Sequence, residues 1–393
     1  MLYSEFKNKK LSLLGMGCMR LPTNENGKID ITKTREMVAF AIENGVNYFD
    51  TAYPYHNGES ELVIGEILSH YPRESYYLAD KFPGHQISSS YDPATVFEDQ
   101  LKKCKVDYFD FYLLHNVYEN SINTYRDSRW GIIDYFREQK KNGRIKHLGF
   151  STHGSIEIMK EFLDEFASDM EFCQIQLNYL DWTLQSAREK CELLEGYNIP
   201  VWVMEPVRGG KLANLNEADT ARLKALRPEE SVAAFAFRFL QSVPNVKMIL
   251  SGMSNFSQLC DNIKTFSNEK PLNAEEKNIL FEIAEGLKNS IPCTKCGYCV
   301  SGCPQRIDIP RMLEFYNEMR IAPTTNITMR IDALPVSEQP ASCIGCENCV
   351  NICPQNIKIP EHLADLVAIS KKLPSWTEIS KQREEAAKRL RGE

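Results

Sequence analysis

One cysteine pattern occurs twice in the last quarter of the sequence, and it restricts what this region can fold into. Both "CTKCGYCVSGCP" (293–304) and "CIGCENCVNICP" (343–354) follow C-x2-C-x2-C-x3-C-P, which accounts for eight of the 13 cysteines. Three cysteines spaced two residues apart can bind one corner of a metal cluster. Zinc ribbons use paired C-x2-C knuckles instead, and disulfides do not suit a reducing compartment. The pattern therefore favours iron–sulfur clusters over zinc or disulfides.

The spacing resembles the signature of bacterial two-cluster ferredoxins, in which the fourth cysteine of each run ligates the other cluster. "CPQRIDIP" matches "CPQNIKIP", and a helical run follows each copy. Compact ferredoxins place their two runs closer together, so this offset favours a small, mainly helical domain. The resemblance implies two [4Fe–4S] clusters with these ligands: Cys293, Cys296, Cys299, Cys303, Cys343, Cys346, Cys349 and Cys353.

Upstream of this repeat, short apolar runs alternate with amphipathic helical runs. Eight of the apolar runs, from "LSLLGMG" to "VKMILSGM", read as strands that are buried on both faces. Eight β–α units in series predict a closed (β/α)8 barrel. A doubly wound dinucleotide fold would need a glycine-rich loop after the first strand, where "GMGCMR" lacks a third glycine. We expect a barrel domain over 1–285 and a cluster domain over 286–393.

Polar side chains stand at the ends of three consecutive predicted strands. Asp50 closes "VNYFD", Lys81 closes "YYLADK" and His115 closes "FDFYLLH", while Tyr55 follows in the loop after Asp50. Considered singly, Asp50 could cap a helix, Lys81 could be solvated and His115 could be an ordinary core residue. The carboxyl ends of barrel strands converge on one face, however, so these four side chains are expected to meet in one pocket.

The segments "FDTAYPYHNGESE", "ADKFP" and "LLHN" resemble the aldo-keto reductase family, whose catalytic tetrad falls on these four residues. The resemblance covers the predicted barrel. It implies that Tyr55 donates a proton to the reacting oxygen, that Lys81 stabilises the phenolate, and that Asp50 holds Lys81 in place. His115 would orient the carbonyl or relay a proton. His56 stands where many members have glycine, which is a departure from the family pattern.

The same resemblance implies a nicotinamide cofactor across the mouth of the barrel. Many relatives stack a tyrosine on the nicotinamide ring where this chain has a methionine, Met204. The stretch 251–262 has no lysine or arginine for the 2′-phosphate of NADPH, so NADPH and NADH both stay open; Arg208 or Lys264 could supply that charge. The implied contacts are Ser151, Thr152, Gln176, Met204, Arg208, Gly252, Ser254, Gln258 and Asn262.

These features predict an oxidoreductase that interconverts a carbonyl and an alcohol by nicotinamide hydride transfer and exchanges electrons through two clusters. A hydride carries two electrons, whereas a [4Fe–4S] cluster passes one at a time, so a flavin that divides the pair is a further candidate cofactor. Two alternatives stay open. The cluster domain could be only a structural or protein-docking module, or the barrel could belong to a flavin-containing electron-transfer protein.

Charge and hydropathy restrict the partners. The formal net charge of -7 is spread without a basic block, which argues against nucleic acid. No apolar run is long enough to span a bilayer, and the first residues do not read as an export signal. The remaining cysteines are isolated in apolar segments, as in a reducing compartment. We expect a cytoplasmic enzyme that acts on a small carbonyl or alcohol, with a redox protein as a further candidate partner.

Overall fold

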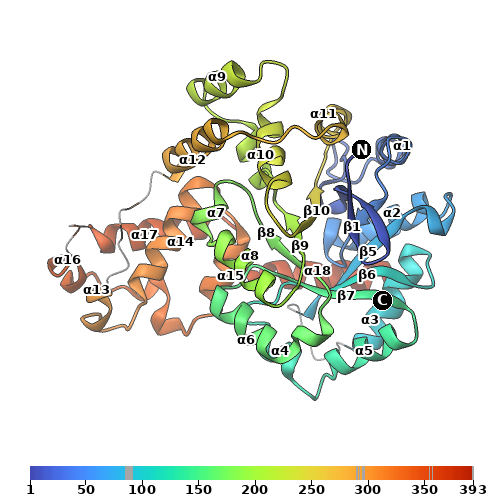
Figure 1. The fold of residues 1–393 in the computed structure, drawn as a ribbon. Coiled ribbons are helices and arrows are strands. Elements are labelled where there is room, and N and C mark those ends of the chain that lie inside the picture. The colour runs from blue at the N-terminus through green and yellow to red at the C-terminus, as the bar shows by residue number, and fades with distance from the viewer. Residues whose placement is uncertain are drawn as a thin grey trace. The chain divides into compact units, whose positions relative to one another are not determined.

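The structure is a computed structural model that describes residues 1–84, 92–288, 291, 293, 297–353, 355 and 357–391. The chain forms two compact units (Figure 1). The first contains Met1–Leu280 together with the C-terminal residues from Arg383 on, and the second contains Phe281–Gln382. The domain boundary that we placed after residue 285 stays a prediction.

Eight parallel strands form a closed barrel in the first unit. The chain order of the strands is also their order around the barrel, and the last strand pairs with the first. This arrangement confirms the (β/α)8 barrel expected from the sequence. The strands are β3 (Leu14–Gly17), β4 (Tyr48–Asp50), β5 (Tyr77–Phe82), β6 (Phe109–Leu114), β7 (Ile145–Thr152), β8 (Cys173–Gln176), β9 (Val201–Met204) and β10 (Val246–Ser251).

Helices follow the strands in sequence, and several bury one apolar stripe against the barrel. In α6 (Ile156–Phe166), the buried residues recur with helical spacing, and the Ser155 side chain caps the first turn by accepting from the Ile158 amide. No helix within the described ranges combines the length and apolarity that a membrane crossing requires. The other helices are α1 (Ile31–Glu43), α2 (Glu59–Leu68), α3 (Pro93–Cys104), α4 (Ile122–Arg126), α5 (Ile132–Lys141), α7 (Asp181–Leu184), α8 (Ala187–Gly196), α9 (Glu217–Leu226), α10 (Val232–Gln241) and α11 (Phe256–Ser267).

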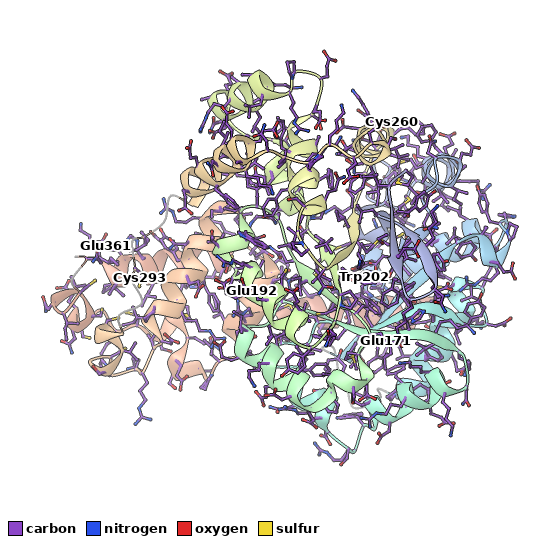
Figure 2. All side chains as sticks on the ribbon, viewed as in Figure 1. Glu171, Glu192, Trp202, Cys260, Cys293 and Glu361 are labelled. Carbon is purple, nitrogen blue, oxygen red and sulfur yellow. The ribbon has the colours of Figure 1, made fainter. Side chains whose placement is uncertain are left out.

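An N-terminal hairpin of β1 (Tyr3–Phe6) and β2 (Lys9–Ser12) closes the barrel at the end where the strands begin. Ser4 bonds to the Lys247 carbonyl near the start of β10. The Phe6 ring packs edge-on against Trp202, with centroids 5.0 Å apart, and Trp202 is fully buried (Figure 2). The Trp202 indole donates to the Tyr48 hydroxyl at 3.1 Å. Because side chains fill this end, we expect a ligand site at the opposite end, where the strands finish.

A polar network fastens the start of α12 (Ala274–Lys288) to the loop after α9. Arg227 makes two hydrogen bonds to the Glu276 carboxylate, at 2.5 and 2.8 Å. Beside it, Arg238 pairs with Glu230 at 3.2 Å and donates to the Asn268 carbonyl at 2.6 Å. The bidentate contact is the stronger kind of ion pair, so it fixes where the chain leaves the barrel.

The second unit is built from helices around one small apolar core. Its helices are the last two turns of α12, then α13 (Tyr298–Ser301), α14 (Ile309–Ile321), α15 (Thr325–Asp332), α16 (Asn348–Asn351), α17 (Ile359–Ser370) and the first residues of α18 (Trp376–Arg391). Pro310 and Pro360 lie in the first turns of α14 and α17, where a missing amide proton costs nothing. The expectation of a small, mainly helical domain after the barrel is confirmed.

Glu171, just before β8, is the centre of an ion-pair cluster (Figure 2). Its carboxylate contacts His147 Nδ1 at 2.8 Å and Lys140 Nζ at 2.5 Å, and it also pairs with Lys7. Burial alone would raise the pKa of Glu171, but hydrogen bonds from these three side chains lower it to about 2. The charged carboxylate is therefore more stable in the folded protein than in the unfolded chain.

We predict that Glu171→Gln destabilises the barrel in a pH-dependent way. Since the pKa is lowered on folding, from 4.5 to about 2, the stabilisation is complete above about pH 4.5 and disappears as the pH falls toward 2. The variant should lose roughly 1–3 kcal/mol of unfolding free energy at pH 7, and the loss should shrink below pH 4. Urea unfolding followed by tryptophan fluorescence measures both values.

The exposed Glu195 provides the control, because Glu195→Gln should leave the unfolding curve unchanged. A Glu171→Gln deficit that is equally large at pH 3 and pH 7 would contradict the lowered pKa.

Candidate active site and cluster-binding cysteines

The four tetrad residues come from neighbouring strand ends at the open end of the barrel. Asp50 is the last residue of β4, Lys81 lies near the end of β5, and His115 directly follows β6. The His115 amide donates to the Phe82 carbonyl at 2.9 Å, which extends the pairing of β5 and β6 by one residue. Tyr55 begins the short helix η2 (Tyr55–Gly58) in the loop after β4. The structure thus brings these four side chains to one place.

Lys81 and Asp50 form a buried ion pair. Lys81 Nζ lies 2.5 Å from Asp50 Oδ1 and donates to the Thr51 carbonyl at 2.6 Å, and the Lys81 side chain is 0% exposed. Burial is the largest influence and would lower the pKa of Lys81, but the charge and hydrogen bond of Asp50, together with Tyr55 and Asp80, outweigh burial and raise it. Lys81 is therefore a fixed positive charge at neutral pH.

Tyr55 lies beside this pair and against the histidine. Lys81 Nζ is 5.0 Å from the centroid of the Tyr55 ring, and the His115 ring meets the Tyr55 ring edge-on at 6.1 Å. Burial raises the pKa of Tyr55, and Lys81 opposes that shift. The phenol is thus protonated at neutral pH, next to a cation that would stabilise its conjugate base.

His56 has a structural role in the loop that carries Tyr55. Its backbone is left-handed, with φ 50° and ψ 42°, a conformation that is easiest for glycine. The His56 Nε2 atom accepts a hydrogen bond from the Leu21 amide at 3.1 Å. Burial lowers the pKa of His56, so the ring stays neutral and able to accept this bond. This contact with the segment after β3 offsets the backbone strain.

A buried network behind the active site fixes the backbone of Lys81, and sequence reasoning missed it. The Lys81 amide donates to Asp80 Oδ1 at 2.8 Å, and Gln100 Nε2 donates to the Lys81 carbonyl at 3.0 Å. Gln100 also donates to Glu61, which pairs with Lys103 at 3.1 Å. The available signal was the helical spacing of Gln100 and Lys103, which places both on one face of α3.

A cavity lies at the ends of β3, β9 and β10, beside the first turns of α11. Four predicted cofactor contacts, Gly252, Ser254, Gln258 and Asn262, are among its lining residues. The amides in the first turn of a helix favour a phosphate group, and α11 starts here. This chemistry fits one end of a phosphate-bearing cofactor. Arg20, which the sequence analysis did not select, also lines the cavity.

Two of the other predicted cofactor contacts, Ser151 and Thr152, make hydrogen bonds within the protein. Ser151 Oγ accepts from the Asn116 amide at 2.8 Å, and Thr152 Oγ1 donates to the Val117 carbonyl at 2.6 Å. These bonds join the end of β7 to the loop after His115. Met204 ends β9 and pairs in register with Gln176 on β8.

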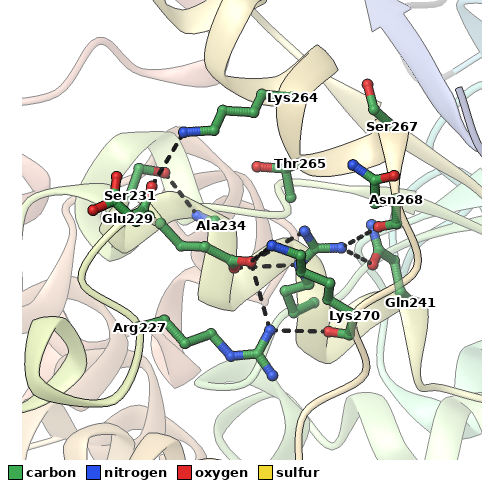
Figure 3. A network of polar contacts seen from close by, with 12 residues as sticks. Arg227, Glu229, Ser231, Ala234, Gln241, Lys264, Thr265, Ser267, Asn268 and Lys270 are labelled. Carbon is green, nitrogen blue, oxygen red and sulfur yellow. Dashed lines mark hydrogen bonds and ion pairs between the residues drawn. The ribbon is translucent and has the colours of Figure 1, made fainter.

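Arg208 is buried, and its charge is used inside the protein. Its guanidinium forms an ion pair with Asp181 in α7, and Gln176 Nε2 donates to the same carboxylate at 2.8 Å. Lys264 extends from α11 and donates to the Glu229 carbonyl at 3.2 Å (Figure 3). Neither of these cations is among the residues that line the cavity.

Cysteines from both repeated runs meet in the second unit. Cys303, from the first run, lines one cavity together with Cys343, Cys346 and Cys349 from the second run. The described cysteines form no disulfides. Four thiols around one cavity are the donor set that a [4Fe–4S] cluster requires. No three His, Cys, Asp or Glu side chains in the described ranges are arranged to bind a single metal ion.

The complementary set is only partly described. Cys293, Cys299 and Cys353 pack in or against the apolar core of the second unit (Cys293 is labelled in Figure 2). Cys296, which the sequence predicts as a ligand, lies outside the described residues. The pairing of Cys303 with the second run follows the crossed pattern of two-cluster ferredoxins.

Comparisons with known proteins agree with both parts of the chain. The aldo/keto reductase family model matches residues 13–285, and the 4Fe-4S dicluster domain model matches residues 292–358. "Uncharacterized oxidoreductase YqkF" of Bacillus subtilis (strain 168) is 27% identical over 296 residues, which cover 68% of this chain and 90% of that protein. "NADH-specific methylglyoxal reductase" of Escherichia coli (strain K12) is 24% identical over 221 residues, covering 51% of this chain and 65% of that protein.

Solved structures resemble the barrel. The holo form of aldo-keto reductase AKR11C1 from Bacillus halodurans has a TM-score of 0.58 and 25% identity, covering 72% of this chain and 96% of that chain. An aldo-keto reductase from Klebsiella pneumoniae in complex with NADPH has a TM-score of 0.57 and the same two coverages. At 16% identity, the second comparison shows the fold alone.

The cavity that joins both cysteine runs generates a prediction about cluster ligation. If Cys303 completes the cluster of the second run, Cys303→Ser and Cys346→Ser should damage the same cluster, and each should lose roughly half of the bound iron. Cys293→Ser and Cys353→Ser should damage the other one. Anaerobic reconstitution, an iron count per chain and electron paramagnetic resonance of the surviving reduced cluster would group the four variants. A Cys303→Ser spectrum that matches Cys293→Ser instead would contradict the crossed arrangement.

Proposed function

Because the chain belongs to the aldo/keto reductase family, it is an NAD(P)H-dependent oxidoreductase, and we propose that it interconverts a carbonyl and an alcohol at the tetrad. The family acts on small carbonyl substrates. The observation that carries the proposal is the buried Lys81–Asp50 pair beside the Tyr55 phenol and the His115 ring. A cluster of titratable residues at the carboxyl ends of barrel strands, in which the pKa values of Asp50, Tyr55 and Lys81 are shifted, is typical of an active site.

The four side chains have complementary roles in this reaction. A bound nicotinamide dinucleotide supplies or accepts the hydride. Reduction places negative charge on the carbonyl oxygen, and Tyr55 donates its phenolic proton to that oxygen. Lys81 stabilises the resulting phenolate, and Asp50 keeps Lys81 charged and in position. His115, packed against the Tyr55 ring, holds the carbonyl oxygen toward the phenol.

We assign the dinucleotide to the barrel mouth, with its adenosine-phosphate end in the cavity beside α11. Gly252, Ser254, Gln258 and Asn262 would bind that end, and Ser151, Thr152, Gln176 and Met204 would bind the nicotinamide end. Asp261 and Glu205 line the cavity along with Arg20, so the charge at the 2′-phosphate position is mixed. We therefore expect both NADH and NADPH to be accepted, with at most a modest advantage for NADPH.

For the second unit, we propose two [4Fe–4S] clusters with crossed ligands that exchange electrons with the reaction in the barrel. The thiols of Cys303 and the second run around one cavity support this proposal. A flavin could divide the electron pair, and a redox protein could receive single electrons. We place the protein in the cytoplasm because its isolated cysteines, such as Cys104 and Cys173, are buried free thiols.

Tyr55→Phe tests the proton donor. The variant should lower carbonyl reduction by a factor of roughly 10²–10⁴, because the phenolic proton is lost, while nicotinamide affinity should change little. Steady-state kinetics and fluorescence titration with NADPH measure the two quantities. Tyr53→Phe, in the same loop but packed against Lys103, is the matched control and should keep its rate. Retention of the wild-type rate by Tyr55→Phe would remove the assigned role.

Cluster reduction tests the exchange of electrons. The reconstituted protein should lose visible absorption and gain a paramagnetic signal when NADH or NADPH is added without oxygen, with dithionite as the positive control. Reduction that needs added flavin would support a flavin as the step between two-electron and one-electron chemistry. Clusters that dithionite reduces and neither dinucleotide reduces, with or without flavin, would contradict electron exchange and favour a structural or docking role.

A further inference from the structure

The strands that carry Lys81 and His115 end side by side, and one buried hydroxyl lies against both ends. Tyr125 Oη donates to the His115 carbonyl at 2.7 Å and is 3.3 Å from the Phe82 carbonyl. The Phe82 carbonyl also accepts from the His115 amide at 2.9 Å. Burial raises the pKa of Tyr125, so its hydroxyl is protonated and can donate. Hydrogen bonds thus fix the His115 backbone on both sides, at the amide and at the carbonyl.

A glycine makes room for this hydroxyl. A Cβ atom on Gly84 would lie 2.5 Å from two ring carbons of Tyr125 and 2.7 Å from its hydroxyl oxygen, which is closer than such atoms pack. The Tyr125 side chain is almost fully buried, so its ring could move only by displacing its neighbours. The position of the hydroxyl therefore depends on the absence of a side chain two residues after Phe82.

The helix that carries the hydroxyl, α4, folds back on the turn that follows the histidine. The backbone at Asn116 is left-handed there, with φ 56°, a conformation that costs energy for a residue with a side chain. Ser121 Oγ donates to the Asn116 carbonyl at 2.7 Å. At the other end of α4, Arg126 donates to the Glu161 carbonyl on α6 at 2.9 Å (Figure 1). The hydroxyl thus approaches the strand ends from a segment that is held at both of its ends.

The backbone of His115 determines where its imidazole lies. That ring meets the Tyr55 ring edge-on, with centroids 6.1 Å apart, and in the proposed reaction it holds the carbonyl oxygen toward the phenol. A movement of the His115 peptide moves the ring, and a misplacement of about 1 Å in an active site can lower a rate by about 10²-fold. The alignment of the imidazole therefore depends on the bond from Tyr125 to the backbone of His115.

We propose that Tyr125 is a positioning residue for carbonyl reduction. Its hydroxyl, which packs on Gly84, fixes the His115 backbone and thereby the direction of the imidazole toward Tyr55. The inference rests on the proposed reaction at Tyr55. It gives the loop after β6 a part in catalysis, because this loop supplies the hydroxyl.

Two variants of the full-length reconstituted protein remove this support in different ways. Tyr125→Phe keeps the ring and deletes the hydroxyl, whereas Gly84→Ala keeps the hydroxyl and displaces the ring. With NADPH and 4-nitrobenzaldehyde as the probe substrates, each should lower kcat by roughly 5- to 30-fold and leave KM nearly unchanged. The isotope effect on kcat with deuterated NADPH should increase, because hydride transfer becomes slower. Tyr135→Phe, on the outer helix α5, is the control and should keep the wild-type kcat.

Nuclear magnetic resonance tests the placement of the imidazole without turnover. The chain has seven histidines, and labelling them with ¹³C at Cε1 gives one signal for each. The His115 signal is identified by its loss in His115→Ala. In Tyr125→Phe and Gly84→Ala it should shift or broaden, while the signals of the exposed His70 and of His362 in the second unit stay in place.

The combined variant His115→Ala/Tyr125→Phe shows whether the hydroxyl acts through the imidazole. If it does, Tyr125→Phe adds little to the loss that His115→Ala causes. A further loss by the same factor would overturn the proposal, because the hydroxyl would then act independently of the histidine. An unchanged kcat or an unmoved His115 signal in Tyr125→Phe would overturn it as well.

Failure of this inference is distinguishable from failure of the proposed function. An inactive Tyr55→Phe variant beside a fully active Tyr125→Phe variant overturns the role of Tyr125 alone. A Tyr55→Phe variant with the wild-type rate overturns the proposed function, whatever the Tyr125 variants show. A wild-type protein that does not reduce the aldehyde counts against the proposed function, and the histidine signals still decide whether Tyr125 places the imidazole.

Discussion

The active site depends on one buried ion pair, Lys81 with Asp50. Two charges removed from water are stable only when each satisfies the other, and removal of one partner from such a pair typically costs about 3–5 kcal/mol. The pair therefore fixes the relation between β4 and β5, the strands that carry it. Asp80 accepts a hydrogen bond from the Lys81 amide, and Gln100 donates one to the Lys81 carbonyl. These two bonds fix the backbone of Lys81, while Asp50 fixes its ammonium group. The loop after β4 then places the Tyr55 phenol beside the ammonium group of Lys81, which the ion pair has already fixed.

The two units of the chain are stabilised in different ways. The barrel has a large apolar interior that the β1–β2 hairpin closes with Phe6, and it can fold on burial of surface alone. The second unit has a much smaller apolar core, and cysteines from both runs are part of it or packed against it. In domains of this kind, binding of the metal cluster supplies much of the folding free energy. Iron limitation is therefore expected to affect the second unit and to leave the barrel folded.

The sequence predicts the barrel because strands that are buried on both faces appear as continuous apolar runs. Polar residues at the ends of these runs mark where the strands stop. It predicts less where contacts join distant segments. Nothing near His56 indicates its bond to Leu21, since the two lie 35 positions apart. From the sequence alone, Arg208 could supply a positive charge for a phosphate. In the structure its guanidinium forms an ion pair with Asp181 in α7 instead. Arg383 stands in a charged, helical tail whose pattern gives no sign that it returns to the barrel.

Because the residues from Arg383 on belong to the barrel unit, the order of synthesis affects when that unit is completed. The ribosome completes the barrel strands early, and it must then add roughly 100 residues of the second unit before Arg383 is synthesised, which takes about 5–20 s at ordinary rates of translation. The first unit is thus completed only after the residues of the second unit have been synthesised. A premature stop codon anywhere in the cluster region would release a folded barrel without α18. Early termination is therefore expected to yield a folded barrel with an intact tetrad that lacks both α18 and the clusters.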